Sequence, residues 1–286
     1  YEPATWAAGI PAMNFLKTFC TIGLLALANT GSAAVFCVTT TAELNSAIAT
    51  ASTNGQADTI KIHIGSYLLT QGLQYIDESN SDLFISGGWF SIPTACAVQA
   101  ADARLTILDG QGSFGGLFLQ SLSTDAASYS VSNLTITRTR TGLGNHPGIV
   151  ADFQPAGLPD SLDLYNLIIR GNIEANASPT GIRSIGRANV VIRNALIADN
   201  QSPAFVGISA QSNGGGSFYA HHVTVANNVS TGNAYAGIQA TGDVLLTLEN
   251  SIVWGNSSAN RQGNCPLEVT NADRLRFVIA SSICGQ

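Results

Sequence analysis

Apolar and polar positions alternate in five similar segments of the chain. The segments align on one column, which holds Asn133, Asn166, Asn194, His222 and Asn250. The columns two and four residues before it, and three residues after it, are almost wholly apolar, as at Val131, Tyr129 and Ile136 in the first segment. A period of two marks strands that bury one face, and a helical repeat would not keep it in register. The pattern therefore predicts stacked strands around a shared apolar interior.

A fixed period defines the repeating unit. Four asparagines follow one another at intervals of 28 residues, namely Asn172, Asn200, Asn228 and Asn256. A second short strand enters each unit at a Gly-Ile pair, beginning with Gly148, Gly181, Gly207 and Gly237. Repeats of this length stack as a solenoid whose equivalent strands run parallel, about 4.8 Å apart. The sequence predicts an all-β solenoid of roughly 28-residue coils, in one domain over residues 35–286.

A short helix is predicted before the stacked strands. Thr40 and Glu43 have the spacing of a capping box at its start. One face of this helix is apolar and consists of Leu44, Ala47, Ile48 and Ala51. Residues 59–64 then alternate strictly, which predicts a half-buried strand. Because a bare end coil would offer unpaired backbone to other chains, we expect the helix to cap the solenoid.

The aligned column is expected to form a structural ladder. Its asparagines occupy equivalent bends, where each side-chain amide can bond the next; they are Asn133, Asn166, Asn194 and Asn250. His222 interrupts this series. If the column points inward, as its apolar neighbours do, His222 is a hydrogen-bonded core histidine and no ligand.

The charge balance excludes some classes of partner. The 286-residue chain is 10% charged, with a net charge of -6 and no basic run. This composition argues against nucleic acid and against anionic membrane surfaces.

Residues 13–34 resemble a secretory signal peptide. Lys17 precedes a short apolar run, and small residues follow at 32–34. The run is too short for a transmembrane helix, and no membrane insertion of the mature region is expected. Residues 1–12 are interpreted as an over-extended reading frame. The sequence thus predicts a secreted or cell-surface protein, expected to be a monomer.

Four cysteines remain after the predicted signal peptide, and in an exported protein an even number favours disulfides. Cys37 with Cys96 is the preferred pair. Cys265 with Cys284 is the remaining option, and either of these two can instead pair with residues beyond the chain end. No pair has the C-x-x-C spacing that favours zinc.

The coils between Asn133 and Asn256 and the turn at residues 108–112 resemble right-handed parallel β-helix proteins of the pectin-lyase-like superfamily. So do residues 41–60 and 85–89, followed by Cys96. The resemblance implies a right-handed parallel β-helix, which serves lyases, hydrolases and adhesins alike. Residues 281–286 look like a further copy of 250–256 cut off at the end of a coil, so the domain is expected to be truncated at its C-terminus.

The resemblance implies two catalytic arrangements, and neither is evident. Lyases of this fold use a calcium-held carboxylate cluster with a basic residue, and the hydrolases use several close aspartates. Acidic residues are sparse in the regular coils. We therefore predict no specific activity, metal site or cofactor, and leave calcium open.

The best candidate site is the outward face of the strand before the aligned column. It holds Asp163, Tyr165, Arg193, Tyr219, His221 and Glu249. Stacking should bring Arg193, His221 and Glu249 into one row, with neighbours about 5 Å apart. The alternative interpretation of these residues is a solvated polar face with cross-strand charge pairing.

The predicted export, solenoid and polar strand face are compatible with three functions. The first is a secreted or surface-displayed protein that presents this strand face to an extracellular ligand, with polysaccharide as the expected class. The second is a polysaccharide lyase or glycoside hydrolase. The third is a structural adhesin or passenger stalk without catalysis.

Overall fold

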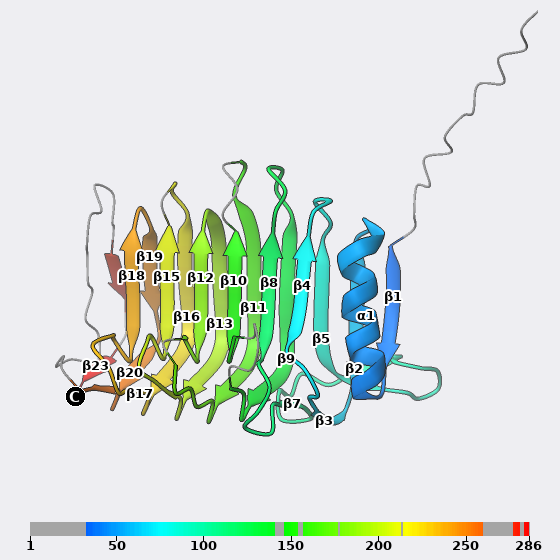
Figure 1. The fold of residues 1–286 in the computed structure, drawn as a ribbon, viewed down its shortest axis with the longest axis horizontal. Coiled ribbons are helices and arrows are strands. Elements are labelled where there is room, and N and C mark those ends of the chain that lie inside the picture. The colour runs from blue at the N-terminus through cyan, green and yellow to red at the C-terminus, as the bar shows by residue number, and fades with distance from the viewer. Residues whose placement is uncertain are drawn as a thin grey trace, which may run out of the picture. The chain divides into compact units, whose positions relative to one another are not determined.

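Strands stacked in three sheets, preceded by one helix near the start, form the regular structure of the described part of the chain (Figure 1). This computed structural model describes residues 33–140, 146–153, 157–176, 178–212, 214–259, 277–280 and 283–285. Equivalent strands of successive coils run parallel, each one coil beyond the last. The prediction of an all-β solenoid is confirmed.

Sheet A is the largest of the three and contains 14 of the described strands. Its main path is β1 (Ala34–Val38), β2 (Asp58–His63), β5 (Leu83–Phe90), β9 (Ser128–Thr137), β11 (Asp160–Arg170), β13 (Ala188–Ala198), β16 (Ser217–Ala226), β19 (Leu245–Glu249) and β22 (Phe277–Ala280). Five further strands pair beside this path: β3 (Gly65–Leu68), β6 (Val98–Gln99), β7 (Thr106–Asp109), β20 (Ile252–Trp254) and β23 (Ile283–Gly285).

Two smaller sheets, of six and three strands, contribute to some of the coils. Sheet B consists of β4 (Leu73–Asp77), β8 (Leu117–Ser121), β10 (Ile149–Phe153), β12 (Ile182–Gly186), β15 (Ile208–Ser212) and β18 (Ile238–Gly242). Sheet C consists of β14 (Gln201–Ser202), β17 (Val229–Ser230) and β21 (Ser257–Ser258). The strands of sheet B that follow the Gly-Ile pairs begin at the predicted isoleucines.

Helix α1 (Thr41–Asn54) lies at the N-terminal end of sheet B, beside β4 (Figure 1). Its capping box is complete, because Thr40 Oγ1 accepts the Glu43 amide and the Glu43 carboxylate accepts the Thr40 amide. The apolar face predicted from the sequence is the buried face, so α1 takes the place of a first strand and covers the edge of β4.

The apolar columns line the interior as predicted. Two residues before the aligned column, five side chains are at most 1% exposed: Val131, Leu164, Ile192, Ala220 and Leu248. Three residues after it, the five are fully buried: Ile136, Ile169, Ile197, Val225 and Val253. Burial of this apolar surface is the main force that holds the coils together.

The aligned column, here called the bend column, has an unexpected orientation. All five of its residues have positive φ, between 48° and 56°. A left-handed residue interrupts the alternation of a strand, so Leu164 and Leu167 both face inward while Asn166 between them faces out. The prediction that this column points inward is therefore wrong. His222 is exposed and is not a core histidine.

A buried asparagine ladder lies one turn further along each coil. Asn172, Asn200 and Asn228 are fully buried, and Asn256 is 7% exposed. Each of the first three donates its Nδ2 to Oδ1 of the next asparagine, at 2.8–3.0 Å. These residues set the 28-residue period, and their amides bind successive coils to one another inside the fold.

Glycines that directly precede the strands of sheet B let successive coils approach closely. A Cβ atom on Gly148, Gly181 or Gly207 would lie within about 2.1 Å of a carbonyl oxygen in the next coil. Because no side chain fits there, the Gly-Ile pairs reflect packing of backbone on backbone.

An excursion of residues 91–105 connects β5 to β7. It contains β6, which runs antiparallel to β5, and Cys96, which forms a disulfide with Cys37 of β1. The preferred cysteine pair is thus present. The predicted signal peptide up to Ser32 lies outside the described residues, as do Cys265 and the side chain of Cys284. Of the expected terminal copy, the backbone of residues 283–285 is described, and it pairs with β20 in register.

Candidate functional site

The polar row consists of Tyr165, Arg193, His221 and Glu249. Strand register places Tyr165 beside Arg193, Arg193 beside His221, and His221 beside Glu249. Neighbouring parallel strands lie about 4.8 Å apart, so the four side chains follow one another across four coils on the outside of sheet A. The predicted alignment of Arg193, His221 and Glu249 is confirmed, and Tyr165 extends it by one coil.

Asp163 and Tyr219 flank the polar row and pair with it. Arg193 donates to Asp163 Oδ2 at 2.5 Å and lies over the Tyr165 ring, 5.7 Å from its centroid. About half of the Arg193 side chain and two fifths of that of Asp163 remain exposed. An ion pair this exposed contributes little to stability and leaves both groups accessible to a ligand.

Tyr219 and Glu249 form the second pair on this face. The Tyr219 hydroxyl donates to Glu249 Oε2 at 2.6 Å. This hydrogen bond to a carboxylate raises the pKa of Tyr219, because ionising the phenol would lose it and place two negative charges together. The Tyr219 and His221 rings are nearly parallel, with centroids 6.0 Å apart.

His222 belongs to this face and not to the core. Its ring lies 3.8 Å from that of His221, centroid to centroid. The next residue of the bend column is Asn250, and its Nδ2 atom lies 3.0 Å from His221 Nε2. The preference of asparagine for positive φ is the sequence signal that the bend column differs from an ordinary inward column.

A trough runs along the bend, beside the polar row. Its volume is about 550 Å³, and three successive coils line it through Asn166, Asn194 and His222, together with Ile168, Leu196 and Thr224. Ala101, Asp102, Ala103 and Arg104 of the excursion line it as well. Asn194 follows Arg193 in the chain, and His222 follows His221, so the trough and the polar row form one continuous surface.

Amide groups line this trough in a partial ladder. Asn166 donates to Asn133 Oδ1 at 2.7 Å, and Asn194 donates to Asn166 Oδ1 at 3.1 Å. The series stops there, because His222 occupies the next position. Since a side-chain amide has two N–H groups and an oxygen with two lone pairs, Asn194 keeps hydrogen-bonding capacity for a ligand.

Sequence reasoning missed a second set of polar groups, on the outside of sheet B. Within the described residues, His146 Nδ1, Asp152 Oδ1 and Arg183 Nε are buried without a hydrogen-bond partner. Burial lowers the pKa of Arg183, and burial together with the Arg183 charge lowers that of His146. Only the packing of sheet B reveals this set, since its residues have no common spacing.

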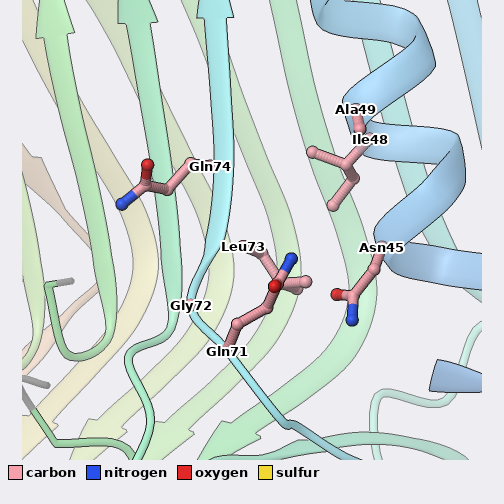
Figure 2. Close-up of a pocket in the computed structure, with 7 residues that line it drawn as sticks. All are labelled: Asn45, Ile48, Ala49, Gln71, Gly72, Leu73 and Gln74. Atoms are coloured by element: carbon pink, nitrogen blue, oxygen red, sulfur yellow. The ribbon is translucent and has the colours of Figure 1, made fainter. Parts of the chain in front are cut away.

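The hollow between α1 and β4 is a less suitable site. It measures about 290 Å³, and Figure 2 shows the side chains of Asn45 and Gln71 extending into the same space. Its lining residues are amides, aliphatic side chains and Gly72, with no charged group. It belongs to the contact between the cap and sheet B.

Among the described residues, no group of three or more His, Cys, Asp or Glu side chains is arranged to hold a metal ion. No helix in these ranges has the length and apolar character needed to cross a bilayer.

Comparison with known proteins identifies the fold family. Residues 120–273, more than half of the chain, match the family described as right handed beta helix region. The chain belongs to the right-handed β-helix family. No curated protein and no solved structure matches this right-handed β-helix protein. The family defines the handedness of the coil and leaves the chemistry to the site itself.

Proposed function

We propose that this right-handed β-helix protein is exported and binds an extracellular carbohydrate along the polar row and the trough. The observation that carries the proposal is the position of these two surfaces. An in-register row of aromatic, cationic and anionic groups adjoins a trough lined by Asn166, Asn194 and His222.

The chemistry of this surface suits a sugar. A sugar ring has apolar C–H faces and a rim of hydroxyl groups that both donate and accept hydrogen bonds. Tyr165 offers an exposed aromatic ring, and Ile168 and Leu196 offer aliphatic surface in the trough. The amides of Asn166 and Asn194 match the hydroxyl rim.

The stacked coils favour a polymer over a single sugar. Equivalent groups recur at about 4.8 Å along the solenoid, so several weak contacts can act on one chain. The signal-like segment at residues 13–34 and the Cys37–Cys96 disulfide support export, because disulfides persist in oxidising compartments.

A glycan array tests the proposal. Wild-type protein should bind a polysaccharide class, and Arg193→Ala and His221→Ala should each weaken that binding by about tenfold, equivalent to about 1.4 kcal/mol. Arg170→Ala is the matched control, because Arg170 is an exposed arginine of β11 beyond the bend, paired with Asp199 at 3.8 Å. Absence of binding to any glycan, or an equal loss in the control, would contradict the proposal.

The same preparation distinguishes the alternatives. Release of unsaturated uronides from pectin or alginate, seen as new ultraviolet absorbance, would establish a lyase. If the protein binds no glycan and releases no unsaturated uronide, but is displayed at the cell surface, the remaining function is a structural stalk.

A further inference from the structure

We infer that the trough is closed at one end and recognises the end of a carbohydrate chain. This inference rests on the proposed function and adds the part of the polymer that is bound. It follows from the path of the excursion at residues 91–105, which crosses the outside of the next coil.

The crossing is visible in the burial of equivalent residues. In β9, Asn133 and Thr135 point outward, yet they are only 5% and 7% exposed. Thr135 Oγ1 donates to the carbonyl of Ala103 at 2.8 Å, so the excursion lies directly on them.

The same two columns are open in the following coils. Asn166 and Ile168 are half-buried in β11, and Asn194 is exposed in β13. His222 is exposed in β16. The trough therefore ends against the excursion at β9 and is open toward the later coils.

The part of the excursion that closes the trough, here called the end wall, consists of residues 101–104. Several contacts hold the excursion in place. The Cys37–Cys96 disulfide ties the excursion to β1. Near its base, Gln99 Nε2 donates to the carbonyl of Gly87 at 2.9 Å, and the Ala100 amide donates to that of Gly88 at 2.8 Å. A segment held by such contacts loses little conformational entropy when a ligand packs against it.

The end wall offers both a carboxylate and a guanidinium group. Asp102 accepts two hydrogen bonds from the Arg104 side chain, at 2.9 and 2.8 Å. These bonds lower the pKa of Asp102 to about 2, so the carboxylate is charged at neutral pH. Both residues line the trough and remain accessible, with side-chain exposures of 33% and 79%.

This chemistry fits the terminal sugar of a chain. A terminal residue has a free hydroxyl at the position where an internal residue carries a glycosidic bond. Carboxylates and guanidinium groups bind such hydroxyls through charge-assisted hydrogen bonds. An internal segment would have to continue through the space that Ala103 and Asp102 occupy.

Competition between short and long chains tests the inference. The probes are oligosaccharides of β-1,4-glucan, β-1,4-mannan and α-1,4-galacturonan, each paired with a polymer of the same sugar roughly ten times longer. For the glycan class bound on the array, recognition of chain ends predicts that short and long chains compete equally at the same molar concentration. At equal mass the short chains should then compete about tenfold better.

Variants of the end wall give a second readout. Asp102→Asn with Arg104→Ala should weaken binding of the short chains by about tenfold, while Arg170→Ala should not change it. Both residues are on the surface, and thermal melting checks that the double variant is folded. Competition that scales with the number of sugar units, together with unchanged binding in the double variant, would overturn the inference alone. Failure of wild-type protein to bind any glycan would overturn the proposed function and this inference with it.

Discussion

Asn200 and Asn228 are joined by two hydrogen bonds to one oxygen atom. Oδ1 of Asn228 accepts the side-chain Nδ2 of Asn200 at 2.9 Å and its backbone amide at 3.2 Å. Both side chains are fully buried. The same arrangement joins Asn172 to Asn200 and Asn228 to Asn256, so each link holds two neighbouring coils together.

Asn200→Ala should be strongly destabilising. The substitution removes the Nδ2 bond to the Ile169 carbonyl and leaves the buried Asn172 amide without its acceptor. Each buried group left unsatisfied costs about 1–3 kcal/mol, so we expect a loss of at least about 3 kcal/mol in urea unfolding. The control is Asn194→Gly, which keeps positive φ on the exposed bend column and should cost much less. Equal losses would show that the buried ladder has no special role.

Gly181→Ala should prevent close stacking of the coils. The added Cβ would lie 1.9 Å from the Gly207 carbonyl oxygen, which is backbone and cannot rotate away. We expect a large drop in melting temperature or failure to fold, by the mechanism of overpacking. Gly214→Ala is the matched control, because the nearest atom to its Cβ would be Cδ of the Arg187 side chain at 3.7 Å, an ordinary van der Waals contact. A melting temperature for Gly181→Ala equal to that of the control would contradict the close contact.

Asp160 should make stability depend on pH in an uncommon direction for a carboxylate. It is 3% exposed, and burial raises its pKa above the ordinary value. A folded pKa above the unfolded one means that its contribution is most favourable below the unfolded pKa and is lost as pH rises through the folded pKa. Asp160→Asn keeps an oxygen acceptor for the Ala127 amide, now bound at 2.8 Å, and removes the charge.

We therefore expect Asp160→Asn to be more stable than wild type at pH 7 and to lose this advantage near pH 4. Urea unfolding of both proteins at the two pH values measures the difference. An advantage that is the same at both values would indicate that the charge of Asp160 is not the cause.

Loss of the Cys37–Cys96 disulfide should affect both stability and binding. The bridge closes a loop with a sequence separation of 59 residues, and disulfides of this kind stabilise by about 2–4 kcal/mol. Cys37→Ser with Cys96→Ser should lower the midpoint of chemical unfolding accordingly. Because the excursion is then tied less firmly, glycan binding should weaken by more than in Arg170→Ala. Reduction with a thiol reagent, followed by the same two measurements, is the independent check.

Much of the fold could be predicted from periodicity. The apolar columns, the Gly-Ile entries, the capping box at Thr40 and the row from Arg193 to Glu249 all follow from spacing. This works because parallel coils stack equivalent positions above one another, so a one-dimensional repeat becomes a three-dimensional column.

The orientation of the bend column could not be predicted in this way. One residue with positive φ changes which of the following side chains point inward. The alternation of apolar and polar residues does not reveal the sign of φ. Alternation therefore predicts a core position for His222, although it lies on the surface beside His221.

The spacing of apolar residues is enough to predict a parallel solenoid with a helical cap, because burial of periodic apolar residues leaves few other solutions. Which asparagines form the buried ladder, and where the trough ends, emerge from the folded arrangement. Those outcomes depend on the left-handed bends and on the path of residues 91–105 across the next coil. Such contacts join residues far apart in the chain, as between Ala103 and Thr135, and no local pattern encodes them.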